Sequence, residues 1–155
     1  MSITALQLGS ELVRRAAKRN FKLTNLSLQK LAYFAHGWHL ALFDKPLLEE
    51  NDAFEAWRYG PVLPELYHAL KAFSNNNIPA DHPLIASQEE LDSTRVEAKL
   101  IEKILDEYGN FSSFQLVRLS HDPDGPWAKV YSEPGFSIAI DDDSIGRFFK
   151  KDLEN

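Results

Sequence analysis

The sequence predicts a mainly α-helical fold: one compact domain of six to seven helices around a buried central helix, with at most a short β-hairpin. Its length of 155 residues suits one domain with one sizeable core. Its composition, 44% hydrophobic and 26% charged, is that of a folded globular protein. In several segments the apolar residues recur every three or four positions, which is the spacing of one helix face. We therefore expect residues 1–155 to form a single domain.

The N-terminal third is predicted to hold two helices. Residues 3–19 have the apolar spacing of an amphipathic helix, with four cations toward its C-terminal end. Asn25 or Ser27 can cap a second helix that runs to about Phe43. This second helix is apolar on most faces, so we expect it to be the central helix, packed on all sides.

The middle of the chain is predicted to alternate turns and short elements. Leu47-Leu48 and residues 53–57 are expected to form a small β-hairpin or extended arms. A tight turn follows at 59–61, because Gly60 precedes a proline and so avoids helical angles. A third helix is expected over 62–73, and a polar loop over 74–86.

Capping signals dominate the prediction for the C-terminal half. Ser87 and Glu90 have the spacing of a capping box. This predicts a long amphipathic helix that runs to Tyr108 and is ended by Gly109. The other elements expected, in chain order, are a helix from Ser112 or Ser113 through Leu119, a short helix over 128–131, a strand over 137–140 and a last helix opened by Asp141-Asp142-Asp143.

The charge balance and the cysteine count exclude several classes of protein. Lys and Arg number 17 against 23 Asp and Glu, and the net charge of −6 disfavours non-specific binding to nucleic acid or anionic membrane. The absence of cysteine excludes disulfides, cysteine-ligated zinc, iron–sulfur clusters and a thiol nucleophile. No signal-peptide pattern opens the chain, and its longest strongly apolar stretch, 31–43, is too short to span a membrane. We therefore expect a cytoplasmic protein without a membrane or nucleic-acid partner.

Two features resemble metal sites. His36 and His39 lie three residues apart on the central helix. With Glu55 or His68 they could ligate a metal, but no third ligand stands at a diagnostic spacing, so we favour hydrogen-bonded histidines. The aspartate run at 141–143 could bind a hard cation, but capping of a helix N-terminus explains it without one. The prediction is therefore no metal and no cofactor.

Two further features resemble a catalytic base and a nucleic-acid patch. His121 lies beside Asp122 and Asp124 and could act as a general base, but no nucleophile can be assigned to it. We expect it instead to donate to a backbone carbonyl and to hold the loop beneath Trp127. The cations near the end of the first helix could bind nucleic acid, but a solvated helix end explains them more simply. They are Arg14, Arg15, Lys18 and Arg19.

Three motifs resemble, in order and spacing, those of one known protein family. The first is Leu-Gln-Lys-Leu-Ala-Tyr-Phe-Ala-His-Gly-Trp at 28–38, and the second is Phe-Glu-Ala-Trp-Arg-Tyr-Gly-Pro-Val at 54–62. The third is Leu-Ser-His followed by Gly-Pro-Trp, within 119–127. Together they are similar to the Panacea domain of the SocA-like antitoxins, which are often phage-associated. The resemblance spans about residues 5–150, with Ser120 where the family pattern has Thr.

The resemblance implies an antitoxin of a type II toxin–antitoxin system, which binds and neutralises a cognate protein toxin encoded nearby and has no catalytic activity. Rigid, partly exposed aromatic and arginine side chains suit such a binding surface. The partner-binding residues implied are Tyr33, His36, Trp57, Arg58, Tyr59, Pro61, His121 and Trp127. For most of these, a role in the core or in bracing a loop is the alternative. Two other functions remain open, a proteolytic adaptor that delivers a toxin to a protease and a metal-dependent hydrolase, and a homodimer is possible.

Overall fold

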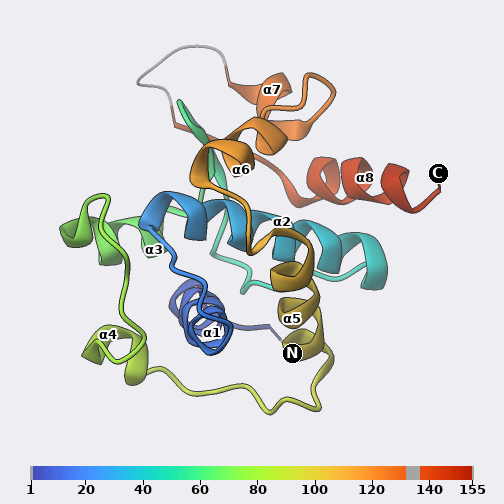
Figure 1. Ribbon diagram of the computed structural model, residues 1–155. Helices are drawn as coiled ribbons and strands as arrows, with labels where there is room; N and C mark the ends of the chain where they lie inside the picture. Colours follow the sequence, from blue (N-terminus) through green and yellow to red (C-terminus); the bar gives the residue numbers. More distant parts are fainter. Residues whose placement is uncertain (1, 132–136, 155) are drawn as a thin grey trace.

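Helices make up most of the protein, as the sequence predicts, and a small antiparallel sheet completes it (Figure 1). The computed structural model describes residues 2–131 and 137–154. Its elements, in chain order, are α1 (Ala5–Lys18), α2 (Asn25–Phe43), β1 (Glu55–Trp57), β2 (Gly60–Val62), α3 (Pro64–Leu70), the 3₁₀ helix η1 (Lys71–Phe73), α4 (Pro83–Ala86), α5 (Val96–Tyr108), α6 (Ser113–Ser120), α7 (Pro126–Val130), β3 (Ile138–Ala139) and α8 (Asp142–Leu153). The mainly α-helical fold class is confirmed, with eight α-helices in this part of the chain rather than six or seven. None of the helices described here combines the length and apolar character that a membrane span requires.

The predicted central helix is confirmed as α2, which packs against α1, α5, α6 and α8. Of its 19 residues, 15 are buried. In Figure 1, α8 lies alongside α2. Gly37 permits this close approach, because a Cβ at that position would overlap the ring of Phe149. Tyr33, one turn earlier on α2, packs against Phe54 and Phe149 with ring centroids 5.5 and 5.6 Å away.

A small hairpin forms, but not between Leu47-Leu48 and residues 53–57 as predicted: Leu48 bridges Ile3 instead. β1 pairs antiparallel with β2, with Glu55 opposite Val62. The turn between the two strands is Arg58-Tyr59, one residue earlier than predicted. β3 lies within the predicted strand 137–140 and pairs with the other edge of β1. The sheet order is therefore β2-β1-β3, one strand more than the hairpin that the fold class allowed.

Two helix boundaries in the middle of the chain differ from the prediction. The capping box expected at Ser87 and Glu90 does not form, and α5 begins later, at Val96. Ser87 instead follows α4, a four-residue helix within the predicted polar loop. His82 caps α4 through its Nδ1, which accepts a hydrogen bond from the backbone N–H of Leu84 at 3.2 Å.

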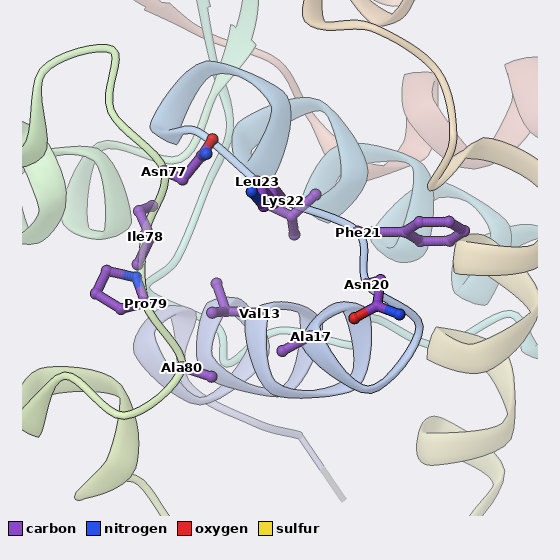
Figure 2. Close-up of a pocket in the computed structure, with 10 residues that line it drawn as sticks. All are labelled: Val13, Ala17, Asn20, Phe21, Lys22, Leu23, Asn77, Ile78, Pro79 and Ala80. Carbon is purple, nitrogen blue, oxygen red and sulfur yellow. The ribbon is translucent and has the colours of Figure 1, made fainter.

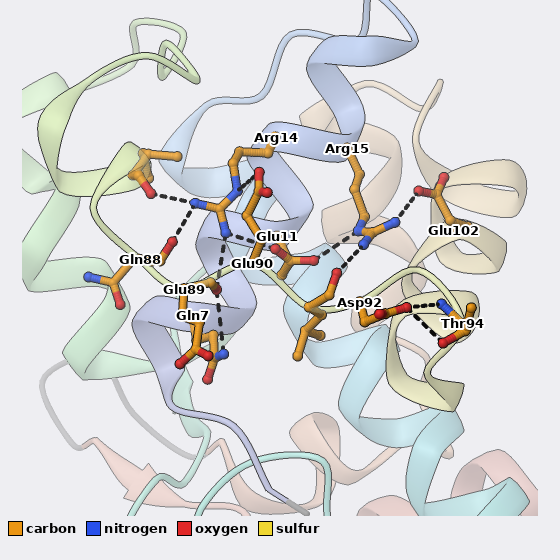
Figure 3. Close-up of polar contacts among 12 residues, drawn as sticks. Gln7, Glu11, Arg14, Arg15, Gln88, Glu89, Glu90, Asp92, Thr94 and Glu102 are labelled. Carbon is orange, nitrogen blue, oxygen red and sulfur yellow. Dashed lines mark hydrogen bonds and ion pairs between the residues drawn. The ribbon is translucent and has the colours of Figure 1, made fainter.

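Two arginines of α1 explain why the segment before α5 is not helical (Figure 3). The Arg14 guanidinium donates to the carbonyl oxygens of Ile85 and Gln88 at 2.7 and 3.0 Å. Arg15 donates to the carbonyl oxygen of Leu91 at 3.0 Å. These bonds fasten the segment to α1 at three carbonyl oxygens. The segment is therefore held against α1 as a loop, in place of the first turns of the predicted helix.

The helix caps elsewhere agree with the sequence or lie within one residue of it. Ser112 caps α6 in a capping box with Gln115, and Asp141 caps α8, so both predicted capping roles are confirmed. α2 is capped by Thr24 rather than by Asn25 or Ser27. The Ser27 side chain completes a capping box with Thr24 by accepting from its backbone N–H at 2.9 Å.

A cavity of about 440 Å³ opens between the C-terminal half of α1 and two extended segments, 20–23 and 77–80 (Figure 2). A hydrogen bond of 2.9 Å from the N–H of Ile78 to the carbonyl oxygen of Leu23 joins the two segments. Most of the side chains around the cavity are apolar, and none of those described is His, Asp or Glu. The described lining therefore offers no imidazole or carboxylate for acid–base or metal chemistry, and Lys22 is its one ionisable side chain.

Candidate functional site: the β1–β2 hairpin and its support

The three sequence motifs, far apart along the chain, meet around the β1–β2 hairpin. Lys30 of the first motif donates from Nζ to the carbonyl oxygen of Pro61 at 2.8 Å. Trp127 of the third motif donates from its indole Nε1 to the carbonyl oxygen of Trp57 at 2.6 Å. The backbone on both sides of the hairpin turn is therefore held by side chains that the other two motifs supply.

Gly60 fits a narrow space beneath the turn. Its φ of 110° lies in a region that side-chain-bearing residues rarely adopt. A Cβ at this position would lie 2.5 Å from Ser120 Oγ and 2.8 Å from Lys30 Cε. Both the backbone conformation of the turn and its close contact with α2 and α6 therefore favour glycine.

The tip of the hairpin exposes an arginine and a tyrosine. Tyr59 is 58% exposed, and Arg58 Cζ lies 5.5 Å from the centre of its ring. Behind them, the half-buried Trp57 packs against Tyr67 of α3, with ring centroids 5.0 Å apart. Large aromatic and arginine side chains on a rigid support are typical anchors of protein–protein binding. We call Trp57, Arg58 and Tyr59 the hairpin surface.

A stack of rings supports the hairpin from α7. The His121 ring lies parallel to the Trp127 indole with centroids 3.7 Å apart, and Trp127 stacks in turn on Tyr131. The predicted contact between His121 and the Trp127 loop is confirmed. The predicted hydrogen bond to a carbonyl is wrong for Nε2, which is buried and has no partner among the described residues. Burial lowers the pKa of His121, and the positive charge of Lys30 lowers it further.

Lys30 is the member of this site that the sequence reasoning did not single out. It is fully buried on α2, and no carboxylate in the described part of the chain forms an ion pair with it. Burial lowers the pKa of Lys30 from 10.5 to about 7. The signal lay in the first motif, where Lys30 stands between the core positions Leu28 and Leu31.

Three of the eight predicted partner-binding residues are buried. Tyr33 and His36 are each 1% exposed, and Pro61 lies in β2, which is buried throughout. His36 Nε2 lies 2.8 Å from Asp142 Oδ1 at the start of α8. In this structure these three residues therefore belong to the buried interior. The other five, half-buried or exposed, are Trp57, Arg58, Tyr59, His121 and Trp127.

The metal site considered from the sequence is not supported by a cluster of ligands in the described residues. In residues 2–131 and 137–154, no group of three or more His, Asp or Glu side chains could hold a metal ion. His39 Nδ1 is instead paired with the carbonyl oxygen of Lys45 at 2.6 Å. His36 is paired with Asp142, as above, so the two histidines have separate partners.

Three of the four cations near the end of α1, namely Arg14, Arg15 and Arg19, have acidic partners. Arg15 pairs with Glu11 at 2.9 Å and with Glu102 of α5 at 2.8 Å (Figure 3). Arg19 pairs with Glu102 and Asp106, one turn apart on α5. These arginines therefore join α1 to α5 rather than forming the free basic patch that nucleic-acid binding needs.

The fold presents one hairpin, supported from two sides, whose exposed tip has residue types common at protein-binding surfaces. A small helical domain fixes one hairpin from two sides and leaves aromatic and arginine side chains at its tip. Comparison with known proteins then gives the family. The family model described as "Antitoxin SocA-like, Panacea domain" matches residues 28–128, from the start of the first motif to just past the third.

One curated relative agrees with the family model. Antitoxin SocA of Caulobacter vibrioides (strain NA1000 / CB15N) is 34% identical over 149 residues, which cover 90% of this chain and 76% of that relative. No solved structure matches the chain. The chain therefore belongs to the SocA-like antitoxin family with its Panacea domain. Membership supports an antitoxin role and implies a toxin as partner.

Proposed function

We propose that this protein is the antitoxin of a type II toxin–antitoxin system, and that it neutralises a protein toxin in the cytoplasm by binding it directly through the hairpin surface. The observation that carries the proposal is the convergence of three separate motifs on one turn. Lys30, Gly60 and Trp127 fix the turn, while Arg58 and Tyr59 are left exposed at its tip.

Preorganisation of the turn supports this role. Trp127 fixes the carbonyl of Trp57 on one side, and Lys30 fixes the carbonyl of Pro61 on the other. A tip held at both ends loses little backbone entropy when a partner binds, so more of the contact energy appears as affinity. The exposed Arg58 and Tyr59 also stack on each other, which limits their side-chain freedom before binding.

The first test is the capture of the partner. The protein, tagged at its native locus, is expected to recover one stoichiometric protein whose expression alone stops growth. Mass spectrometry of the recovered complex identifies that protein. Co-expression of this chain with it restores growth if this chain neutralises it. Recovery of no stoichiometric protein, or of one without effect on growth, would contradict the proposal.

The second test locates the interface with Tyr59→Ala and Arg58→Ala. Truncating a binding anchor costs about 2 kcal/mol or more, so the dissociation constant should rise by roughly 30-fold. Phe114→Ala is the matched control, because Phe114 on α6 is 70% exposed and lies outside the hairpin. Parental affinity in both hairpin variants, with weaker binding by Phe114→Ala, would move the interface to α6.

A proteolytic adaptor would use the same surface, so affinity does not separate the two functions. Direct neutralisation predicts that the half-life of the captured toxin in cells is unchanged when this protein is present. A half-life that shortens on co-expression and recovers in Tyr59→Ala would favour the adaptor.

A further inference from the structure

The buried amine of Lys30 breaks the usual rule for lysines in a core. Lysine is almost never fully buried without a partner, because its ammonium loses its hydration. Lys30 is 0% exposed, and the described residues offer no carboxylate within ion-pair distance. Its Nζ has one hydrogen-bond acceptor in that part of the chain, the carbonyl oxygen of Pro61. A Leu or Met would fill the same space at a smaller cost in desolvation.

The side chain of Lys30 lies directly under the hairpin turn. Its Cε would be 2.8 Å from a Cβ at Gly60, and Ser120 Oγ would be 2.5 Å from the same point. Gly60 is therefore enclosed between Lys30 of α2 and Ser120 of α6. Lys30 therefore contacts the residue that directly follows Tyr59 at the exposed tip.

Among the described residues, no carboxylate forms an ion pair with Lys30, and burial is the cause of its lowered pKa. Of the titratable groups on the elements packed around Lys30, its own helix supplies Tyr33, and the turn supplies Arg58 and Tyr59. The segment after α6 supplies His121 and Asp122, but neither forms an ion pair with Nζ. Burial lowers the pKa of Lys30 to about 7.

His121 resembles Lys30 in that its surroundings also favour the neutral form. Its pKa is lowered by burial and by the charge of Lys30, and its Nε2 is buried without a partner. Both groups are therefore most easily accommodated in their neutral forms. A second proton in this enclosed space would add repulsion between two cations that share one side of the turn.

We propose that Lys30 is a positioning residue of the hairpin surface: its neutral amine holds the Gly60-Pro61 turn in the conformation that binds the partner, and protonation of Lys30 loosens the turn and releases it. An ammonium has three donors and would face one acceptor here, so its hydration requires water to enter beneath the turn. The effect on partner affinity rests on the proposed function. The effect on the turn itself does not.

The first measurement is made on the full chain without any partner. The Cε and Nζ resonances of Lys30 are followed by NMR from about pH 6 to about pH 11, together with exchange protection of the β1 and β2 amides. Lys30 should titrate near 7 rather than 10.5. A group with that pKa changes its neutral fraction about tenfold between pH 8 and pH 6, so hairpin protection should fall by up to tenfold relative to α5 amides.

Lys30→Met separates positioning from packing. Methionine cannot be protonated, so in this variant the exchange protection of the hairpin amides should change little with pH relative to α5. The same measurement on His121→Phe shows how much of any residual pH dependence comes from His121. Lys103→Met is the matched control, because Lys103 is exposed on α5. Titration of Lys30 near 10.5, or hairpin protection in the parent that follows α5 at every pH, would overturn the proposal even if Lys30→Met failed to fold.

The second measurement uses the partner recovered by affinity capture. Its affinity for the parent should be about tenfold weaker at pH 6 than at pH 8, with a clearly smaller change for Lys30→Met. Equal pH dependence in the two proteins would remove Lys30 from the binding mechanism. If no partner is recovered, the proposed function fails, and the amide and lysine titrations still decide whether protonation moves the turn.

Discussion

Replacing Lys30 with methionine should stabilise the protein, although it removes a hydrogen bond. Methionine is unbranched, similar in length and apolar, so it can fill the space between α2 and the hairpin turn. The pKa of Lys30 falls from 10.5 to about 7 on folding. At about 1.36 kcal/mol per pH unit, keeping this side chain buried costs about 5 kcal/mol at neutral pH and below.

The hydrogen bond to Pro61 offsets part of this gain. Losing the Nζ donor leaves a buried carbonyl oxygen without its partner, which costs about 1–3 kcal/mol. The net expectation is that Lys30→Met raises the free energy of unfolding by about 2–4 kcal/mol at pH 7. For a domain of this size the Tm should rise by about 5–10 °C.

The proton on the Lys30 amine also determines how the stability of the parent protein changes with pH. Above about pH 7 the folded state holds Lys30 neutral, while the unfolded chain keeps it charged up to about 10.5. Unfolding therefore takes up a proton in this window, and the stability of the parent rises with pH from about 7 to about 10.5. Lys30→Met should lose that rise, so the two stability curves converge toward high pH.

Urea unfolding followed by far-UV circular dichroism at several values from pH 6 to pH 10 measures both effects. Lys103→Met, at an exposed position on α5, should stay within about 0.5 kcal/mol of the parent at every pH. A Lys30→Met variant that is less stable than the parent throughout, with an unchanged slope against pH, would refute the reasoning. It would mean that Lys30 is charged in the folded state and well solvated or paired.

Three further predictions concern the packing and caps that support the hairpin. Gly37→Ala should destabilise by about 1–3 kcal/mol in urea unfolding, because its Cβ overlaps Phe149, and Phe149→Leu should relieve part of that cost; equal costs in both backgrounds would argue against the contact. Asp141→Ala should cost about 1 kcal/mol through loss of the α8 cap. Hydrogen bonds from Ser144 lower the pKa of Asp141, so its contribution should be present near neutral pH and fade as the pH falls through the carboxyl titration, which stability curves from pH 7 to pH 3 would reveal. Gly60→Ala should cost about 1–3 kcal/mol and shift tryptophan emission, and a variant within 0.5 kcal/mol of the parent would show that the turn tolerates a side chain.

Local sequence signals predicted most of the helices, because their causes lie within a few residues. The Ser112 and Asp141 caps and the all-round apolar surface of α2 need no knowledge of the rest of the chain. The false capping box at Ser87 had an equally good local pattern. It failed because Arg14 draws the carbonyls of that segment onto α1, and a contact across more than 70 residues has no local signature.

The site was predictable as a set of motifs but not as a geometry. Resemblance grouped the motifs, and residue type pointed to Trp57, Arg58 and Tyr59 as anchors. No pattern in the sequence indicated that Trp127 would fix the Trp57 carbonyl. Lys30 was passed over because a lysine within a helix usually reaches solvent, and its burial is decided by the hairpin that covers it.

Two departures from ordinary protein design occur at the same turn, and their coincidence argues for function there. Lys30 is buried beneath the turn with no ion-pair partner among the described residues, and Tyr59 is exposed at its tip. Each is unfavourable for an isolated fold, since the first loses hydration and the second leaves an aromatic ring in water. A hairpin that served stability alone would be better supported by an apolar residue at position 30. The cavity of Figure 2 has mostly apolar lining and no buried charged group, so packing alone accounts for its residues. The hairpin, rather than the cavity, is therefore where this chain gives up stability for a binding surface.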